Sequence, residues 1–289
     1  MAERVACAGR VGSLKWLLPV LALLAGLPAY ASGQPSPLAQ AQAGAAEAKP
    51  EESLPPVPRD CQVGLTEVVT QSPMPNVLKA LRERRRIVIL AIGAAPIVRR
   101  DAGAGGYFDL VEQLLEQTFK GLDVEIIHRG VSGELARDAG ARIQMEVALV
   151  NPDLVLWQVG TADAMARLPV EDFERSLANT LVWLREHNVD VALIGLHYAK
   201  ALAKDKHYQA VRRAVKKVAT EQGVMRVGRY EAIEALARLR GEPGAPASRT
   251  PLTEASYECS AEYLARAIAA ALFHKDKGGT PADKKPSGN

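Results

Sequence analysis

The sequence lacks three features that would each point to a class of function. Neither sign of charge dominates, because 36 Lys and Arg stand against 33 Asp and Glu, for a net charge of +3. This balance gives no reason to expect a nucleic-acid partner. No group of His, Cys and Asp has metal-ligand spacing, so we predict no metal site and no cofactor. Cysteine is scarce as well, with 3 in 289 residues.

An apolar run near the N-terminus is too short to cross a membrane. It extends from Trp16 to Leu27, whereas a membrane-spanning helix needs about 20 apolar residues. Basic residues precede the run, and the small residues Ala29-Tyr30-Ala31 follow it. This order is typical of a secretory signal peptide, so we predict that residues 1–31 are removed before Ser32. An uncleaved membrane anchor is the alternative, and in both cases we expect a periplasmic or secreted domain.

Two segments show no apolar periodicity. Residues 32–60 are rich in Pro, Ala, Gln and Glu and predict a flexible tether. Residues 275–289 are polar and predict a disordered tail. The remaining segment, residues 61–274, has the length of one domain with its own core.

Two cysteines remain after removal of the signal peptide, which contains Cys7. Cys61 lies where the domain begins, and Cys259 lies in the last predicted helix. An even number of cysteines in an oxidising compartment favours a disulfide between them. Two unpaired thiols, one of them buried in the helix, are the alternative.

The domain alternates between apolar runs and amphipathic segments. Strands are predicted at residues 86–93, 124–130, 154–160 and 190–198, with a shorter fifth at 225–230. Helices are predicted at 106–120, 134–150, 170–188, 206–223, 231–241 and 256–273. Alternation of this kind predicts an α/β domain with a central parallel sheet and helices on both faces. Chemistry in such sheets lies beyond the carboxyl ends of the strands, here after Ile92, Ile127, Val159 and Leu196.

Segments at these strand ends carry recognisable motifs. They are Ile87–Gly93 followed by Ala94-Ala95, His128–Glu134, Pro152–Asp163 and Thr250–Cys259. In this order they resemble the blocks of the SGNH/GDSL hydrolases, and in particular a group of exported bacterial members. The resemblance covers residues 86 to about 273 and implies a three-layer α/β/α fold of the SGNH/flavodoxin-like type. It also implies acyl transfer from esters by a Ser, His and Asp, with an oxyanion hole.

The resemblance places residues without the required chemistry at most catalytic positions. In the order nucleophile, oxyanion Gly, oxyanion Asn, Asp and His, the matching residues are Ala95, Gly130, Ala162, Ser248 and Pro251. A shift of one residue does not supply a nucleophile, because Ala94 also lacks a hydroxyl. Loss of one oxyanion donor alone lowers the rate by about 10²–10³. The resemblance therefore implies that ordinary serine-ester hydrolysis is lost.

Other polar residues near the strand ends are candidates to replace the catalytic groups. Ser132 with His128, four positions apart and close to Glu134, forms a conceivable relocated pair; the alternative is that Ser132 is a small residue in a tight loop. His197 and Tyr198, after the fourth strand, are candidates to line a pocket or to form a partly buried polar pair. Asp163 either meets a ligand or caps the segment after the third strand.

These observations lead to three hypotheses about function. The first is a non-catalytic binding or scaffolding protein of the cell envelope that retains the family's pocket. Its partner would be an acylated or acetylated envelope glycan or lipid, or an envelope protein, as the resemblance implies. The second is an active esterase or acyltransferase that uses residues such as Ser132 and His128. The third is a protein–protein module held by the tether.

Overall fold

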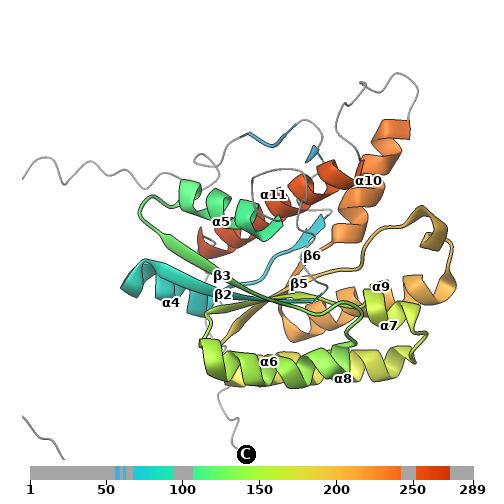
Figure 1. Ribbon diagram of the computed structural model, residues 1–289, viewed down its shortest axis with the longest axis horizontal. Helices are drawn as coiled ribbons and strands as arrows, with labels where there is room; N and C mark the ends of the chain where they lie inside the picture. The colour runs from blue at the N-terminus through green and yellow to red at the C-terminus, as the bar shows by residue number, and fades with distance from the viewer. Residues whose placement is uncertain (1–55, 59–60, 63–67, 94–106, 242–251, 274–289) are drawn as a thin grey trace, which may run out of the picture. The chain divides into compact units, whose positions relative to one another are not determined.

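One mixed sheet lies at the centre of the described chain (Figure 1). The computed structural model describes residues 56–58, 61–62, 68–93, 107–241 and 252–273. The six strands in these ranges are β1 (Val69–Thr70), β2 (Arg86–Gly93), β3 (Asp123–Gly130), β4 (Leu154–Gln158), β5 (Asp190–Ile194) and β6 (Met225–Val227). The predicted signal peptide, the predicted tail and most of the predicted tether lie outside the described residues, as do Ala94, Ala95, Ser248 and Pro251.

The strand order confirms the predicted α/β class. The sheet runs β1-β6-β5-β4-β2-β3, and all neighbours from β6 to β3 are parallel. Counted from β2, this is the order 2-1-3-4-5 of flavodoxin-like folds. The edge strand β1 differs from the prediction, because it pairs antiparallel with β6 through Val69 and Val227. A strand of two residues is too short to show any alternation in the sequence.

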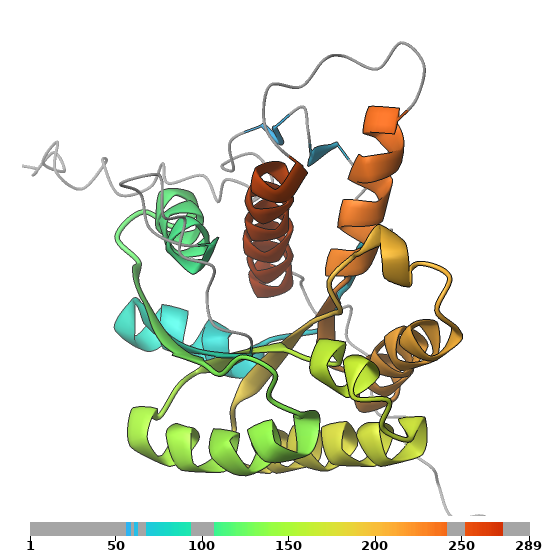
Figure 2. The same ribbon diagram turned by 45° about the vertical axis from the view of Figure 1, so that its right-hand side comes forward.

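Helices cover both faces of the sheet, as Figure 2 shows from the side. In the described chain they are α4 (Pro75–Arg84), α5 (Tyr107–Thr118), α6 (Ala136–Val150), α7 (Thr161–Met165), α8 (Val170–Glu186), α9 (Lys206–Gln222), α10 (Arg229–Gly241) and α11 (Leu252–Phe273), with a 3₁₀ turn at Lys200–Leu202. The helices α4, α5 and α11 pack on one face, and α6, α8 and α9 pack on the other.

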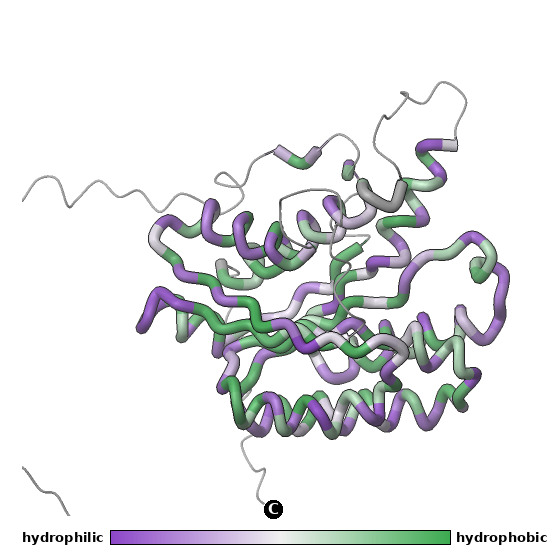
Figure 3. Tube along the Cα trace, viewed as in Figure 1, coloured by the Kyte–Doolittle hydropathy of each residue, from purple (hydrophilic) through white to green (hydrophobic). Residues whose placement is uncertain are grey.

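The two faces follow from the alternation of side chains along β2. Ile87 and Ile89 belong to the core beneath α5 and α11, whereas Leu90 and Ile92 belong to the core above α6 and α8. A strand buried on both faces is a continuous apolar run, because each face needs every second side chain. Figure 3 shows the result, with apolar central strands and helices of mixed polarity around them.

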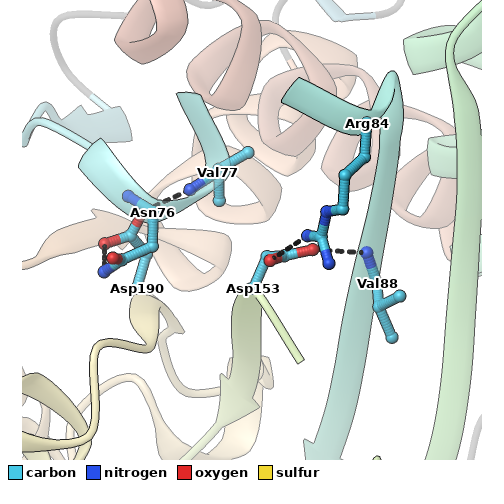
Figure 4. A network of polar contacts seen from close by, with 6 residues as sticks. All are labelled: Asn76, Val77, Arg84, Val88, Asp153 and Asp190. Carbon is cyan, nitrogen blue, oxygen red and sulfur yellow. Dashed lines mark hydrogen bonds and ion pairs between the residues drawn. The ribbon is translucent and has the colours of Figure 1, made fainter. Parts of the chain in front are cut away.

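The helix α4 was not predicted, and a distant carboxylate explains its start (Figure 4). Its N-cap residue, Met74, makes no side-chain cap. Instead Asp190 Oδ2 accepts hydrogen bonds from the backbone N–H groups of Asn76 at 2.8 Å and Val77 at 2.9 Å, and its Oδ1 accepts from the Asn76 amide at 2.9 Å. Burial raises the pKa of Asp190 to about 6, even though these hydrogen bonds lower it. The cap of α4 is therefore a tertiary contact.

A second carboxylate, Asp153, joins β4 to β2 at the same edge of the sheet. Its Oδ2 accepts from the backbone N–H of Val88 at 3.0 Å, and its Oδ1 pairs with the Arg84 guanidinium at 2.5 Å (Figure 4). Asp153 and Asp190 both lie at the amino-terminal ends of the parallel strands. These carboxylates stabilise the fold, and they are on the opposite side of the sheet from the carboxyl ends of the strands, where ligands bind in such folds.

The predicted disulfide is present between Cys61 and Cys259, and both residues are buried. It joins the segment before β1 to α11, across 198 residues of sequence. The Tyr263 hydroxyl, also on α11, donates a hydrogen bond of 2.5 Å to the Cys61 carbonyl oxygen. In the part of the chain that the structure describes, no helix combines the length and apolarity needed to cross a membrane.

Candidate functional site

The sheet has its topological switch point between β2 and β4. From β2 the chain continues to β3 on one side, and from β4 it continues to β5 on the other side. Gly93 ends β2 with φ +138°, and a Cβ atom at this position would lie 2.5 Å from the Cβ of Gln158. Only glycine permits so close an approach of the two strand ends. In sheets of this kind, ligands bind in the crevice that opens at the switch point.

A cavity of about 450 Å³ opens beyond the carboxyl ends of the parallel strands. It is enclosed by the loop after β3, the turn from β4 to α7, the end of β5 and the first residue of α10, with α5 and α11 on the outer side. Its lining residues are Tyr107, Phe108, Val131, Gly133, Glu134, Gln158, Val159, Gly160, Thr161, Ala162, Met165, Gly195, His197, Arg229, Ser256, Tyr257 and Ser260. The carboxyl ends of the strands therefore build the cavity, as the sequence predicts.

The turn from β4 into α7 presents small side chains to the cavity. Gly160 has φ +96°, and a Cβ atom there would lie 2.8 Å from the Cδ1 atom of Leu196. This glycine lets the chain enter α7 directly, so that Thr161 and Ala162 line the cavity. Ala162, at the position that the resemblance assigns to the oxyanion Asn, offers only a methyl group there.

His197 is held in place from three sides. Its backbone N–H donates to Thr161 Oγ1 at 3.2 Å, and its carbonyl oxygen accepts from the Tyr208 hydroxyl at 2.6 Å. Its Nδ1 atom lies 3.0 Å from an Nη2 atom of Arg229. Because a guanidinium only donates, Nδ1 is the acceptor and the neutral ring carries its proton on Nε2. Burial, and secondly the charge of Arg229, lower the pKa of His197 to about 4.

Arg229 brings a positive charge to the cavity. Its guanidinium lies deep in the protein, yet the residue keeps part of its surface accessible because the cavity reaches it. Burial lowers the pKa of this guanidinium, and the nearby phenols of Tyr107, Tyr257 and Tyr208 act against that effect. No carboxylate among the described residues lies within ion-pair distance of Arg229.

Glu134 supplies the negative charge of the cavity wall, but it is already paired. Arg142 donates to both of its oxygens at 2.6 Å, and the Glu134 side chain is only 9% exposed. A two-fold hydrogen bond of this kind fixes the carboxylate and neutralises it.

The structure does not bring Ser132 and His128 together. The side chains of β3 alternate between faces, so His128 points with Ile126 towards α5. There its ring packs 5.2 Å from that of Phe108, and its Nε2 lies 3.7 Å from an oxygen of Asp109. Ser132 is exposed, and neither residue lines the cavity.

Three other residues considered from the sequence also lie outside the cavity lining. Asp163 is buried, and it caps α6 by accepting a hydrogen bond of 3.0 Å from the backbone N–H of Ala136. Burial raises its pKa. Tyr198 packs edge-on against Tyr230, with 5.1 Å between ring centroids. Gly130 ends β3 in register with Gly93.

Sequence reasoning thus placed Glu134, Ala162 and His197 at the site but missed Arg229. A signal for Arg229 was present, since it comes two residues after Val227, the end of the fifth parallel strand. The strand ends named from the sequence stop at Leu196, before this strand. The lining residues on α5 and α11 follow no strand, and only the packing of these helices brings them to the cavity.

Comparison with known proteins supports the same fold. Residues 60–273 match the model of the Non-GDSL lipase-like family. No curated protein matches this sequence. A protein from Parabacteroides merdae described as a GDSL-like lipase superposes with a TM-score of 0.51 at 18% identity, covering 63% of this chain and 94% of that one. A variant of an acetyl-xylooligosaccharide esterase from Geobacillus stearothermophilus superposes with a TM-score of 0.50 at 22% identity, covering 65% of this chain and 95% of that one.

At these identities the solved structures bear on the fold alone. The family match, in contrast, spans well over half of the chain and includes every strand of the sheet. The chain belongs to the Non-GDSL lipase-like family, and its fold is that of the SGNH/GDSL hydrolases.

Proposed function

We propose that this protein is an exported, non-catalytic member of its family that uses the cavity at the switch point to bind a ligand. Ester hydrolysis of the family type needs a hydroxyl nucleophile, an imidazole base hydrogen-bonded to it and donors for the oxyanion. A binding protein needs only a shaped cavity with a few well-placed polar groups.

The state of His197 is the observation that carries the proposal. It is the imidazole that lines the cavity in the described part of the chain, and its Nδ1 already accepts from Arg229 at 3.0 Å. The other nitrogen carries the proton, so the neutral ring has no free lone pair with which to take a proton from a hydroxyl. With a pKa of about 4, His197 is also a weak base at neutral pH. This arrangement suits a positioned hydrogen-bonding group better than a general base.

The oxyanion side of the cavity supports the same conclusion. Ala162 lines the cavity where the resemblance assigns an Asn, and its methyl group donates no hydrogen bond. At the position of Ala162, a transition-state oxyanion would therefore lack the side-chain donor that the family mechanism uses there. The neighbouring Thr161 hydroxyl accepts a hydrogen bond of 3.2 Å from the backbone N–H of His197.

The disulfide supports export. Disulfides persist in oxidising compartments and are rare in the cytosol. A buried bridge between Cys61 and Cys259 thus fits a protein that is exported by the signal peptide that the sequence predicts. We propose the cell envelope as its location, and an acylated or acetylated glycan or lipid of that compartment as the source of its ligand.

The test is hydrolysis of p-nitrophenyl esters with short and medium acyl chains by the purified protein. We expect no turnover above buffer. A catalytically active SGNH esterase of known activity, assayed in parallel, controls for the substrates. Turnover by the purified protein would overturn the proposal. If Ser132→Ala then abolished that turnover, the nucleophile would lie in the loop after β3.

A further inference from the structure

We propose that the cavity binds the carboxylate group of an amphipathic acid, with Arg229 as its counter-charge and the apolar wall of the cavity around its hydrocarbon part. This inference deepens the proposed function, and rests on it for the view that the cavity binds rather than cleaves. It names the chemical class of the ligand.

The unpaired state of Arg229 is the first argument. A charge taken out of water costs free energy unless another group compensates it. Among the described residues the guanidinium has His197 and three phenols near it, and none of these groups is a carboxylate. An arginine kept in such a position is explained by a counter-ion that arrives with a ligand.

The geometry leaves donors for that ligand. A guanidinium has five N–H groups in a planar fork, which matches the two oxygens of a carboxylate. The Nη2 atom is directed at His197, and that contact orients the fork, because Thr161 and Tyr208 hold the histidine backbone. The orientation of Arg229 is thus set before any ligand arrives, which lowers the entropy lost on binding.

The net charge around the cavity favours a ligand with one negative charge. Glu134 is paired with Arg142, which lies behind the lining, and His197 is neutral, so the described lining together with Arg142 carries one net positive charge. A carboxylate matches this charge. A phosphate dianion would leave one uncompensated negative charge in a site of low dielectric constant, beside Glu134.

The remaining wall indicates a hydrocarbon part. Phe108, Val159 and Met165 line the cavity with apolar surface, and Val131 adds to it. Val131 is 44% exposed and Met165 is 59% exposed, so a hydrocarbon chain in the cavity would cover apolar surface that water now contacts. A volume of about 450 Å³ lies within the usual range for small-molecule sites.

Isothermal titration calorimetry on the purified protein tests the inference, with octanoate as the probe. Octan-1-ol, which has the same chain without the charge, and inorganic phosphate are the comparison ligands. We expect octanoate to bind at least ten-fold more tightly than either. Tighter binding of phosphate, or equal binding of the acid and the alcohol, would overturn the proposal.

Variants of two arginines on α10 distinguish a specific contact in the cavity from a general effect of the protein's charge. Arg229→Gln should weaken octanoate binding by about 10- to 100-fold, as expected for loss of charge-assisted hydrogen bonds in a buried site. Arg238→Gln removes the same charge from an exposed position of α10 and should leave the affinity unchanged. Arg229→Lys keeps the charge without the fork and should give an intermediate affinity.

Thermal unfolding tests whether an Arg229 variant loses binding only because its fold is destabilised. Arg229→Met removes an uncompensated buried charge, so the ligand-free variant should melt no lower than the original protein while losing the rise in Tm that octanoate causes. A variant that melts lower but still gains Tm with octanoate would refute the site. Octanoate binding together with ester turnover would refute the non-catalytic function and leave this inference standing.

Discussion

Removal of the disulfide gives a prediction whose size follows from the topology. The bridge closes a loop with a sequence separation of 198, from the segment before β1 to the first half of α11. In the chain-entropy description, a crosslink over so long a loop destabilises the unfolded state by about 5 kcal/mol at 25 °C. Its loss should therefore lower the free energy of unfolding by about that amount, a large share of the stability of a single domain.

Urea unfolding followed by circular dichroism measures this loss. The double variant Cys61→Ala with Cys259→Ala removes the crosslink without leaving a lone thiol. With an m-value of about 2–3 kcal/mol/M, a loss of about 5 kcal/mol moves the midpoint by roughly 2 M. The original protein after reduction serves as the control, because it lacks the crosslink but keeps both buried sulfur atoms.

The two comparisons separate two physical effects. Reduction alone should account for most of the shift, and the further difference between the reduced protein and the double variant reports only packing around two small buried side chains. A shift below about 1 kcal/mol on reduction would refute the entropic reasoning. Alkylation of both Cys61 and Cys259 in the exported protein without reductant would refute the bridge itself.

Two further predictions concern the ends of the sheet. Because the folded-state pKa of Asp190 is raised to about 6, its contribution to stability is fully present below pH 4 and is lost as the pH rises through 6. Relative to Asp190→Asn, whose amide can still cap α4, the original protein should lose a few kcal/mol between pH 4 and 7 in urea titrations; parallel curves would contradict this. Gly93→Ala should lower the free energy of unfolding by about 2–4 kcal/mol, since its Cβ would lie 2.5 Å from the Cβ of Gln158. Gly133→Ala, whose Cβ would have nothing within 4 Å, should lower it by about 1 kcal/mol. Equal losses of stability in the two variants would contradict the close approach at Gly93.

The elements that the sequence predicted best are those with complete local signals. Residues 86–93 form β2 with the predicted bounds, because a strand buried on both faces is apolar throughout. The helix α9 ends at Gln222, and Gly223 follows it with φ +62° as a C-cap glycine does. The helix α4 was not predicted, and its cap comes from Asp190, more than a hundred residues away.

The site was predictable to the extent that it follows strand ends. His197 and Ala162 come directly after β5 and β4, and both line the cavity. His128 comes from the end of β3, but the period of two along that strand turns its side chain towards α5. Arg229 follows β6, and nothing in the local sequence shows that its guanidinium is buried or that His197 accepts its hydrogen bond.

By itself the sequence determined the class of fold and the order of the main strands and helices, and it favoured the pairing of Cys61 with Cys259 and the resemblance to the family. These depend on apolar periodicity, motif order and cysteine number, which are properties of the chain. Only the tertiary structure decided which side chains share the cavity, how His197 is protonated and that Arg229 has no carboxylate partner among the described residues. Those features depend on burial and on contacts between residues distant in sequence, since the free energy of a charge or a hydrogen bond is set by what surrounds it.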